Sequence, residues 1–190
     1  MLHQIQEIDT RLFLFLNGQQ APWADALMYW ATQRNTWIPL YALLLLWLVW
    51  QYRQRAVGTI AALLLTILIA DQTTSGLLKP WVARLRPCYV TYLQGKVHLV
   101  VESCGGQYGF ASSHAANSVG LAVALWLLLG KKLSALRWFF VAWAVLVSYS
   151  RIYVGVHYPF DVLAGALIGS GAAWLAIWTI RRTLKPNWRL

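Results

Sequence analysis

Charged residues are scarce in this chain of 190 residues, and acidic residues are the scarcest of them. Only 12% of the residues are charged, with 16 Lys and Arg against 6 Asp and Glu. A soluble domain carries about 25% charged residues, so the composition excludes a water-soluble globule. A disordered chain is excluded too, because 59% of the residues are hydrophobic and disorder requires low hydrophobicity. The composition therefore indicates a membrane protein.

Long apolar runs fill most of the chain. A helix needs about 20 predominantly apolar residues to cross the hydrocarbon core of a bilayer. Five stretches meet this requirement: residues 32–50, 56–78, 112–130, 133–154 and 159–180. We therefore expect an all-α fold, an integral membrane bundle of five transmembrane helices. Residues 22–30 are a further short apolar patch that either lengthens the first span or forms a separate helix, so six helices are the alternative.

The N-terminal segment, residues 1–31, has a different pattern. Ile5, Ile8, Leu12 and Phe15 recur at helical spacing and alternate with charged residues. A helix with one apolar and one charged face lies along a membrane surface. We therefore expect an interfacial N-terminal helix, and a single membrane-embedded domain over residues 1–190.

Most of the basic residues lie at one end of the five-span arrangement. Nine cations occupy the loop after the first span, the loop after the third span and the C-terminal tail: Arg53, Arg55, Lys131, Lys132, Arg137, Arg181, Arg182, Lys185 and Arg189. Short loops rich in Lys and Arg stay in the cytoplasm. We therefore expect a cytoplasmic C-terminus. Contacts with anionic headgroups account for these charges, so the net charge of +10 requires no nucleic-acid partner.

A second group of ionisable residues lies at the opposite, outward end. It comes from three separate segments of the chain: Lys79, Arg84, Arg86, His114, Arg151, His157 and Asp161. Ionisable residues at membrane depth are costly, and their usual role is functional. Lys and Arg neutralise and orient phosphoryl oxygens, Arg through a planar fork. The cluster therefore predicts a site for a compact, highly charged anion such as phosphate.

Two local patterns complete this site. Residues 110–114, F-A-S-S-H, open the third span, and free backbone N–H groups at a helix N-terminus bind anions. Asp161 follows His157 by four residues, which places the two side chains within reach on a helix. A carboxylate can fix the tautomer of a histidine and raise its basicity. We therefore expect His157 to be a nucleophile that Asp161 orients.

Three ordered motifs resemble the signature of the type 2 phosphatidic acid phosphatase (PAP2) superfamily, which also includes vanadium haloperoxidases. Residues 79–87 match K-x6-R-P, and residues 150–161 match S-R-x5-H-x3-D. The middle motif, P-S-G-H, reads A-S-S-H here, so that Ala111 and Ser113 replace the proline and the glycine. The motifs lie within residues 79–161, which we take as the catalytic core.

The resemblance implies a PAP2/haloperoxidase-like helical core and a bacterial inner (cell) membrane enzyme with its active site facing the periplasm or outside. His157 would attack phosphorus and form a phosphohistidine, with Asp161 orienting it. His114 would protonate the leaving oxygen and then activate water. Neither a metal ion nor another cofactor is required. The phosphate oxygens would be bound by Lys79, Arg86, Ser112, Ser113 and Arg151.

The segment between the second and third spans contains three further residues of interest, two cysteines and an arginine. Cys88 and Cys104 lie in the outer loop between the second and third spans, where an oxidising compartment would allow a disulfide. Arg84 matches no position of the signature. We expect it to face the membrane interface, with an auxiliary contact to a headgroup as the alternative.

The expected partner is a lipid phosphate, together with the membrane lipids themselves; no protein partner is inferred. Candidate substrates are undecaprenyl diphosphate, phosphatidylglycerophosphate or phosphatidic acid, and lipid A phosphates. Two other functions stay open, a lipid-to-lipid phosphotransferase and a transporter of a phosphate-bearing solute. The absence of an internal repeat argues against the transporter.

Overall fold

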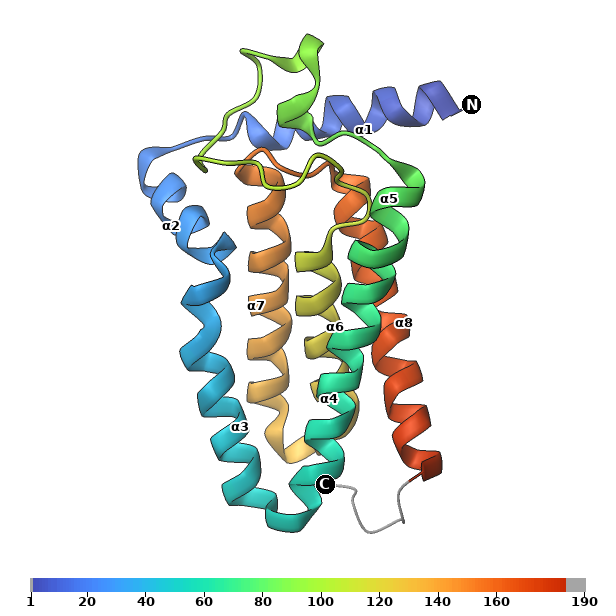
Figure 1. The fold of residues 1–190 in the computed structure, drawn as a ribbon. Coiled ribbons are helices and arrows are strands. Elements are labelled where there is room, and N and C mark those ends of the chain that lie inside the picture. Colours follow the sequence, from blue (N-terminus) through green and yellow to red (C-terminus); the bar gives the residue numbers. More distant parts are fainter. Residues whose placement is uncertain (1, 184–190) are drawn as a thin grey trace.

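The computed structural model describes residues 2–183, and within them every regular element is a helix. The elements α3 (Ile38–Tyr52), α4 (Ala56–Asp71), α6 (Ser113–Leu128), α7 (Ser134–Tyr153) and α8 (Pro159–Thr183) run along one another as a bundle (Figure 1). Each predicted apolar run overlaps one of these helices, so the all-α prediction is confirmed.

Several stretches have the length and composition to cross a membrane. Three helical stretches are long and apolar enough, namely Arg34–Val82, Lys131–Tyr153 and Pro159–Thr183. The first of them reverses direction at Arg53, which has a positive φ of 50° (Figure 1). α6 is apolar but shorter. The molecule is therefore a helical membrane protein.

Of the two alternatives for the apolar patch at residues 22–30, the structure has the separate helix. Helix α2 (Pro22–Thr32) is a separate element, and a 3₁₀ turn (Arg34–Trp37) connects it to α3. Pro39 lies in the first turn of α3. Proline has no N–H and its ring collides with the preceding turn, so it favours the start of a helix over its continuation.

The segment that carries the first motif has an irregular helical geometry. α4 continues through a π-helical stretch (Gln72–Leu78) into the short helix α5 (Lys79–Val82). The helix ends at Ala83, whose φ is +49°. The following loop, 84–112, crosses the end of the bundle and is closed by a disulfide between Cys88 and Cys104, whose Cα atoms are 6.6 Å apart.

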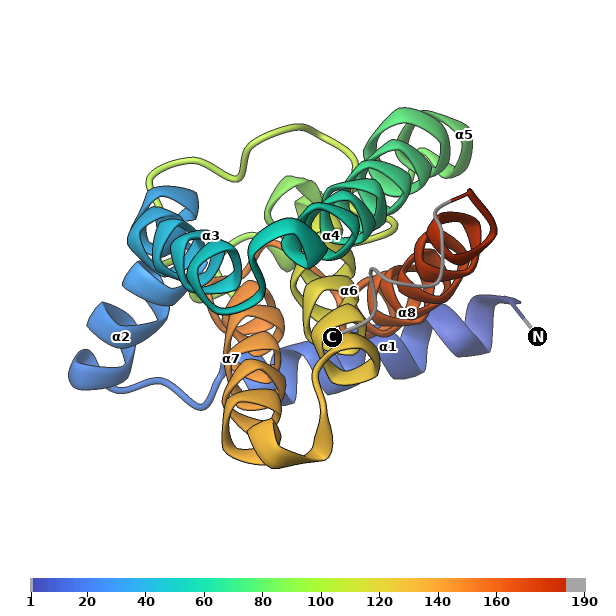
Figure 2. The same ribbon diagram turned by 90° about the horizontal axis from the view of Figure 1, so that it is seen from below.

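Helix α6 is the centre of the bundle and packs against α4, α7 and α8 (Figure 2). Its contact with α8 depends on small residues. A Cβ added at Gly165 would collide with the backbone oxygen of Ser112, and one added at Gly169 would collide with that of Ala116. Glycine therefore permits an approach of the two backbones that no other residue allows.

Helix α1 (Leu2–Asn17) lies across the end of the bundle, beside loop 84–112 (Figure 1). The predicted apolar residues Ile5, Ile8, Leu12 and Phe15 are exposed, as expected for a helix that meets a membrane surface. The α3–α4 turn, the α6–α7 turn and the end of α8 lie at the other end of the bundle (Figure 1). The cationic loops and the PAP2-like motifs are thus at opposite ends. Lys185 and Arg189 lie outside the described residues.

Candidate active site

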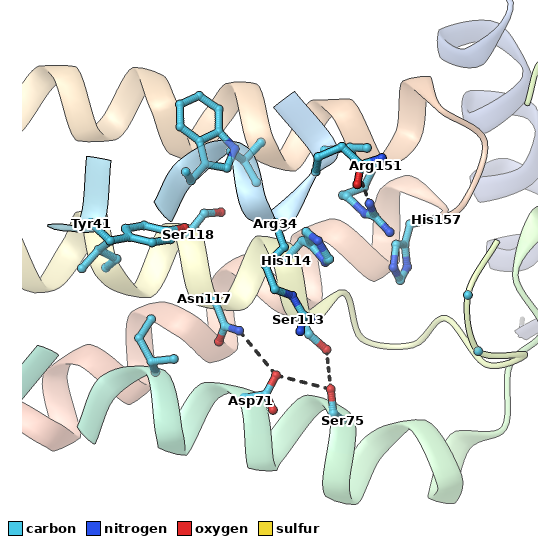
Figure 3. A pocket seen from close by; sticks show the side chains of 18 of the residues that line it. Arg34, Tyr41, Asp71, Ser75, Ser113, His114, Asn117, Ser118, Arg151 and His157 are labelled. Atoms are coloured by element: carbon cyan, nitrogen blue, oxygen red, sulfur yellow. Dashed lines mark hydrogen bonds between the residues drawn. The ribbon is translucent and has the colours of Figure 1, made fainter. Parts of the chain in front are cut away.

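One cavity of about 770 Å³ lies at the end of the bundle that α1 covers. The three motif segments converge on it although they are far apart in the sequence. Figure 3 shows His114, Arg151 and His157 pointing toward one another in this cavity. Six of the predicted site residues line it: Lys79, Arg86, Ser113, His114, Arg151 and His157.

One part of the cavity wall is apolar. It continues between α3 and α4, along Tyr41, Leu44, Leu45, Leu63 and Leu64. Leu64 lines the cavity and is also 62% exposed, so the cavity reaches the outer surface of the bundle. The site therefore has a charged end and an apolar groove that opens on the outer surface of the bundle.

His157 is buried, being 1% exposed, and its hydrogen bonds define its tautomer. Arg86 Nη1 lies 3.2 Å from His157 Nε2. Because a guanidinium only donates, Nε2 is the acceptor and the ring proton is on Nδ1. Nδ1 faces Asp161 Oδ2 at 3.4 Å, and Asp161 Oδ2 also accepts the N–H of Tyr158 at 3.1 Å. Nε2 therefore carries the lone pair on the side where Arg86 lies.

Burial and nearby positive charge act together on His157. Desolvation, followed by the charges of Arg151 and Arg86, lowers the pKa of His157 well below its usual range. A histidine with such a pKa is neutral at pH 7, which is the state in which Nε2 can attack an electrophile.

Two buried polar atoms of cavity-lining residues have no hydrogen-bond partner within residues 2–183. They are Arg86 Nε and Arg151 Nε. Ser112 Oγ has none either, but Ser112 is buried and is not among the residues that line the cavity. Buried polar groups are nearly always hydrogen-bonded, so an unpaired set in one site needs an explanation. An anion with several oxygens in the cavity, such as phosphate, would satisfy both guanidinium groups.

Ser113 has a different environment from the other predicted phosphate-binding residues. Its hydroxyl accepts a hydrogen bond from Lys79 Nζ at 2.7 Å and lies 2.7 Å from Ser75 Oγ (Figure 3). Thr74 Oγ1 donates to it as well, at 3.1 Å. Ser113 therefore holds Lys79 against the N-terminus of α6.

Sequence reasoning missed several residues of the cavity. Thr32 accepts a hydrogen bond from Arg151 Nη1, and Arg34 points into the cavity beside His114 (Figure 3). Asn117 Nδ2 donates to Asp71 Oδ1 at 3.4 Å. Thr32 ends α2 and Arg34 begins the following 3₁₀ turn. This part of the chain has no motif and reaches the site only through tertiary packing.

The prediction that Arg84 faces the membrane interface was wrong. Its side chain is only 19% exposed and forms ion pairs with two buried carboxylates, at 2.8 Å to Asp9 and 2.9 Å to Asp161. Two buried carboxylates need a compensating cation, and Arg84 is placed to supply it.

Together these features define a class of protein: a helical membrane protein with a buried, neutral histidine among cations at the head of an apolar cavity. The model of the PAP2 superfamily matches residues 59–185. The chain belongs to this superfamily, and the resemblance seen in the motifs is confirmed.

Two curated relatives cover most of the chain. It is 41% identical over 177 residues to the lipid A 4'-phosphatase of Bacteroides thetaiotaomicron, and the alignment covers 92% of this chain and 78% of that protein. It is 33% identical over 178 residues to the undecaprenyl-diphosphatase of Sulfolobus acidocaldarius, with 89% and 77% covered.

Two solved structures share the fold. LpxE of Aquifex aeolicus aligns with a TM-score of 0.69 at 25% identity, covering 89% of this chain and 94% of that one. The PAP2 type phosphatidylglycerolphosphate phosphatase of Bacillus subtilis aligns with a TM-score of 0.72 at 23% identity, covering 96% and 89%. The second likeness supports the fold alone.

Proposed function

We propose that this protein is a membrane lipid phosphatase that hydrolyses a lipid phosphate or diphosphate through a phosphohistidine on His157. The observation that carries the proposal is the unprotonated Nε2 of His157, which lies 3.2 Å from Arg86 Nη1, beside unpaired donors and at the end of an apolar groove. A lipid phosphate has the same two parts, a multiply charged head and an apolar chain.

In the first step Nε2 of His157 attacks phosphorus, and the bond from phosphorus to the lipid oxygen breaks. His114 donates its proton to the leaving oxygen, which departs as a lipid alcohol or, from a diphosphate, as a lipid monophosphate. Lys79, Arg86 and Arg151 stabilise the charge on the transferring group, together with Ser112. Asp161 keeps the proton of His157 on Nδ1.

In the second step water hydrolyses the phosphohistidine. His114 accepts a proton from water, the resulting hydroxide attacks phosphorus, and the P–N bond breaks to release inorganic phosphate. His157 regains its free Nε2. The residues of this scheme are those of the catalytic core 79–161 within a single domain.

The relatives favour one substrate class over another. The 41% identity to a lipid A 4'-phosphatase across 92% of this chain supports a glycolipid phosphate of the lipid A type. Undecaprenyl diphosphate is the second candidate, supported by the identity to an undecaprenyl-diphosphatase. In both cases the apolar groove between α3 and α4 would hold the acyl or prenyl chain.

We further infer a five-span topology in a bacterial cell membrane, with the active site facing outward and the C-terminus in the cytoplasm. The cationic α3–α4 and α6–α7 turns support this orientation, because they lie at the end opposite the site (Figure 1). Helix α1 would lie in the outer interface and α2 beside it.

Phosphate release by the purified full chain in detergent tests the function. The panel contains lipid A, undecaprenyl diphosphate, phosphatidylglycerophosphate and phosphatidic acid, each with and without chelator. We expect release from at least one lipid, and a loss of about a thousandfold or more in His157→Ala, the scale of removing a nucleophile. Unchanged release by His157→Ala, or no release from any lipid, would overturn the proposal.

A radiolabelled donor separates hydrolysis from transfer. We expect the label to appear as inorganic phosphate even when an acceptor lipid is present. Label on the acceptor lipid would instead identify a phosphotransferase.

A further inference from the structure

Helix α1 faces the protein with one narrow stripe of its surface. Asp9, Phe13 and Asn17 are 0%, 0% and 1% exposed, and they follow one another at intervals of four residues. Residues at this spacing lie on one face of a helix. The opposite face is exposed, so α1 touches the rest of the molecule mainly through this stripe.

The stripe follows the chain segment that carries His157. Asn17 Nδ2 donates to the backbone oxygen of Tyr153 at 2.7 Å, at the end of α7. Phe13 packs edge-on against Tyr158, with ring centroids 5.4 Å apart. Asp9 Oδ1 accepts the backbone N–H of Phe160 at 2.9 Å, in the first turn of α8. α1 thus contacts the chain before and after the nucleophile.

Arg84 extends this contact to the carboxylate partner of His157. Its Nη2 lies 2.8 Å from Asp9 Oδ2, and its Nη1 donates to Asp161 Oδ1 at 2.9 Å. Its guanidinium also covers the ring of Tyr158 at 3.9 Å. Asp9 and Asp161 are both 0% exposed, so the two carboxylates and the cation form a buried chain that ends at the active site.

We propose that Asp9 and Arg84 are positioning residues for His157, and that α1 thereby helps to orient the side chains of the active site. This rests on the proposed function, in which His157 is the nucleophile. Arg84 holds Oδ1 of Asp161, which keeps Oδ2 turned toward Nδ1 of His157. Asp9 holds Arg84 in place and neutralises part of its charge.

Substitutions in this chain of charges should shift the pKa of His157, whereas substitutions that disturb packing alone should not. The charged and titratable groups that face His157 are Lys79, Arg86, His114, Arg151 and Asp161. Asp161 is the only acidic group among them, and a hydrogen bond to the backbone of Gly109 also favours the protonated ring. Arg84 lies against Asp161 and opposes its charge. Removal of the Arg84 charge raises the pKa of His157, whereas removal of the Asp9 charge frees Arg84 to act on Asp161 and lowers it.

The test compares Asp9→Asn and Arg84→Gln with Glu7→Gln, a matched control on the same helix. Glu7 is exposed and pairs only with Arg11 among the described residues, at 2.6 Å. The full-length variants in detergent are assayed with the lipid that the panel identifies. We expect kcat to fall about tenfold or more in both, the scale at which loss of an orienting partner acts, with little change in KM.

The pH profile of kcat/KM provides the decisive readout. We expect the acid limb to move to higher pH in Arg84→Gln and to lower pH in Asp9→Asn, and to stay in place in Glu7→Gln. Arg84→Lys keeps the charge but cannot bridge two carboxylates, so it should lower kcat and shift the limb less than Arg84→Gln.

Each outcome is distinguishable from failure of the proposed function. An active His157→Ala would refute the nucleophile itself. An inactive His157→Ala, with wild-type kcat and an unmoved acid limb in Asp9→Asn and Arg84→Gln, would overturn the positioning role alone. If Asp9→Asn does not elute as a folded monodisperse species, the two Arg84 variants decide the question.

Discussion

Ser113, which stands where the PAP2 signature has glycine, is accommodated by hydrogen bonds to its neighbours. Its hydroxyl accepts a hydrogen bond from Lys79 Nζ at 2.7 Å and lies 2.7 Å from Ser75 Oγ. A glycine could make neither contact. The first and second motifs are therefore linked directly by a side chain. The motif residues themselves could be predicted from sequence. The contact between Ser113 and Ser75 could not, because Ser75 lies outside every motif.

At the same scale we predict the pH dependence of the reaction. His157 must be neutral to attack, and burial with the charges of Arg151 and Arg86 lowers the pKa of His157 well below its usual value. The acid limb of kcat/KM should therefore lie below about pH 6.5, the unperturbed value for histidine. Activity should persist to higher pH until the acid that protonates the leaving group is lost, which gives a bell-shaped profile.

Arg86→Gln provides the control for this profile. The variant loses a cation and a donor to Nε2, so the pKa of His157 rises and the acid limb moves toward higher pH. Overall activity falls because Arg86 also binds phosphate in our scheme, and the position of the limb is the quantity to compare. A wild-type acid limb above pH 6.5 would contradict the prediction.

Among the elements, the pair α6 and α8 does most to position the site. Ser112, at the start of α6, donates its N–H to the backbone oxygen of Asp161 at 2.9 Å, so the two motif-bearing ends are tied together. This depends on Gly165 and Gly169, which allow the close approach. The helices could be predicted from apolar runs. The π-helical stretch Gln72–Leu78 could not, because its residues show no pattern that differs from an α-helix.

We predict that Gly169→Ala destabilises the protein and Gly171→Ala does not. A Cβ at residue 169 would collide with the backbone oxygen of Ala116, whereas a Cβ at residue 171 meets nothing within 4 Å. Overpacking of this kind costs about 1–3 kcal/mol, and alanine in an open helical position gains up to about 1 kcal/mol over glycine. Thermal unfolding in detergent measures both; equal melting temperatures would refute the argument.

At the scale of the whole molecule, charge is separated along the bundle. The turns whose charged residues are all basic lie at one end. The site with its buried ion pairs lies at the other end, under α1 and loop 84–112 (Figure 1). The N-terminal helix was predicted as an interfacial element, and its exposed apolar residues agree with that role. Its buried Asp9 was not predicted to take part in the site.

The proposed topology predicts which residues a membrane-impermeant maleimide reaches in intact spheroplasts. In a Cys88→Ser/Cys104→Ser background that retains activity, Gln20→Cys and Lys96→Cys should be labelled, and Lys131→Cys only after lysis. All three positions are exposed. Gln20 also tests the span count, because a transmembrane α2 would place it on the side opposite to Lys96. Labelling of Lys131→Cys in intact cells would reverse the orientation.

The amino-acid sequence was sufficient to predict the all-helical membrane class, the apolar runs and the identity of the motif residues. Each of these depends on local information: hydropathy over about 20 residues or fixed spacing within one segment. Two contacts became known only from the packing of the helices: Arg84 pairs with Asp161, 77 residues away, and Asn17 contacts Tyr153, 136 residues away. Periodicity shows that a side chain is buried or charged, but which buried charges meet depends on how the helices pack.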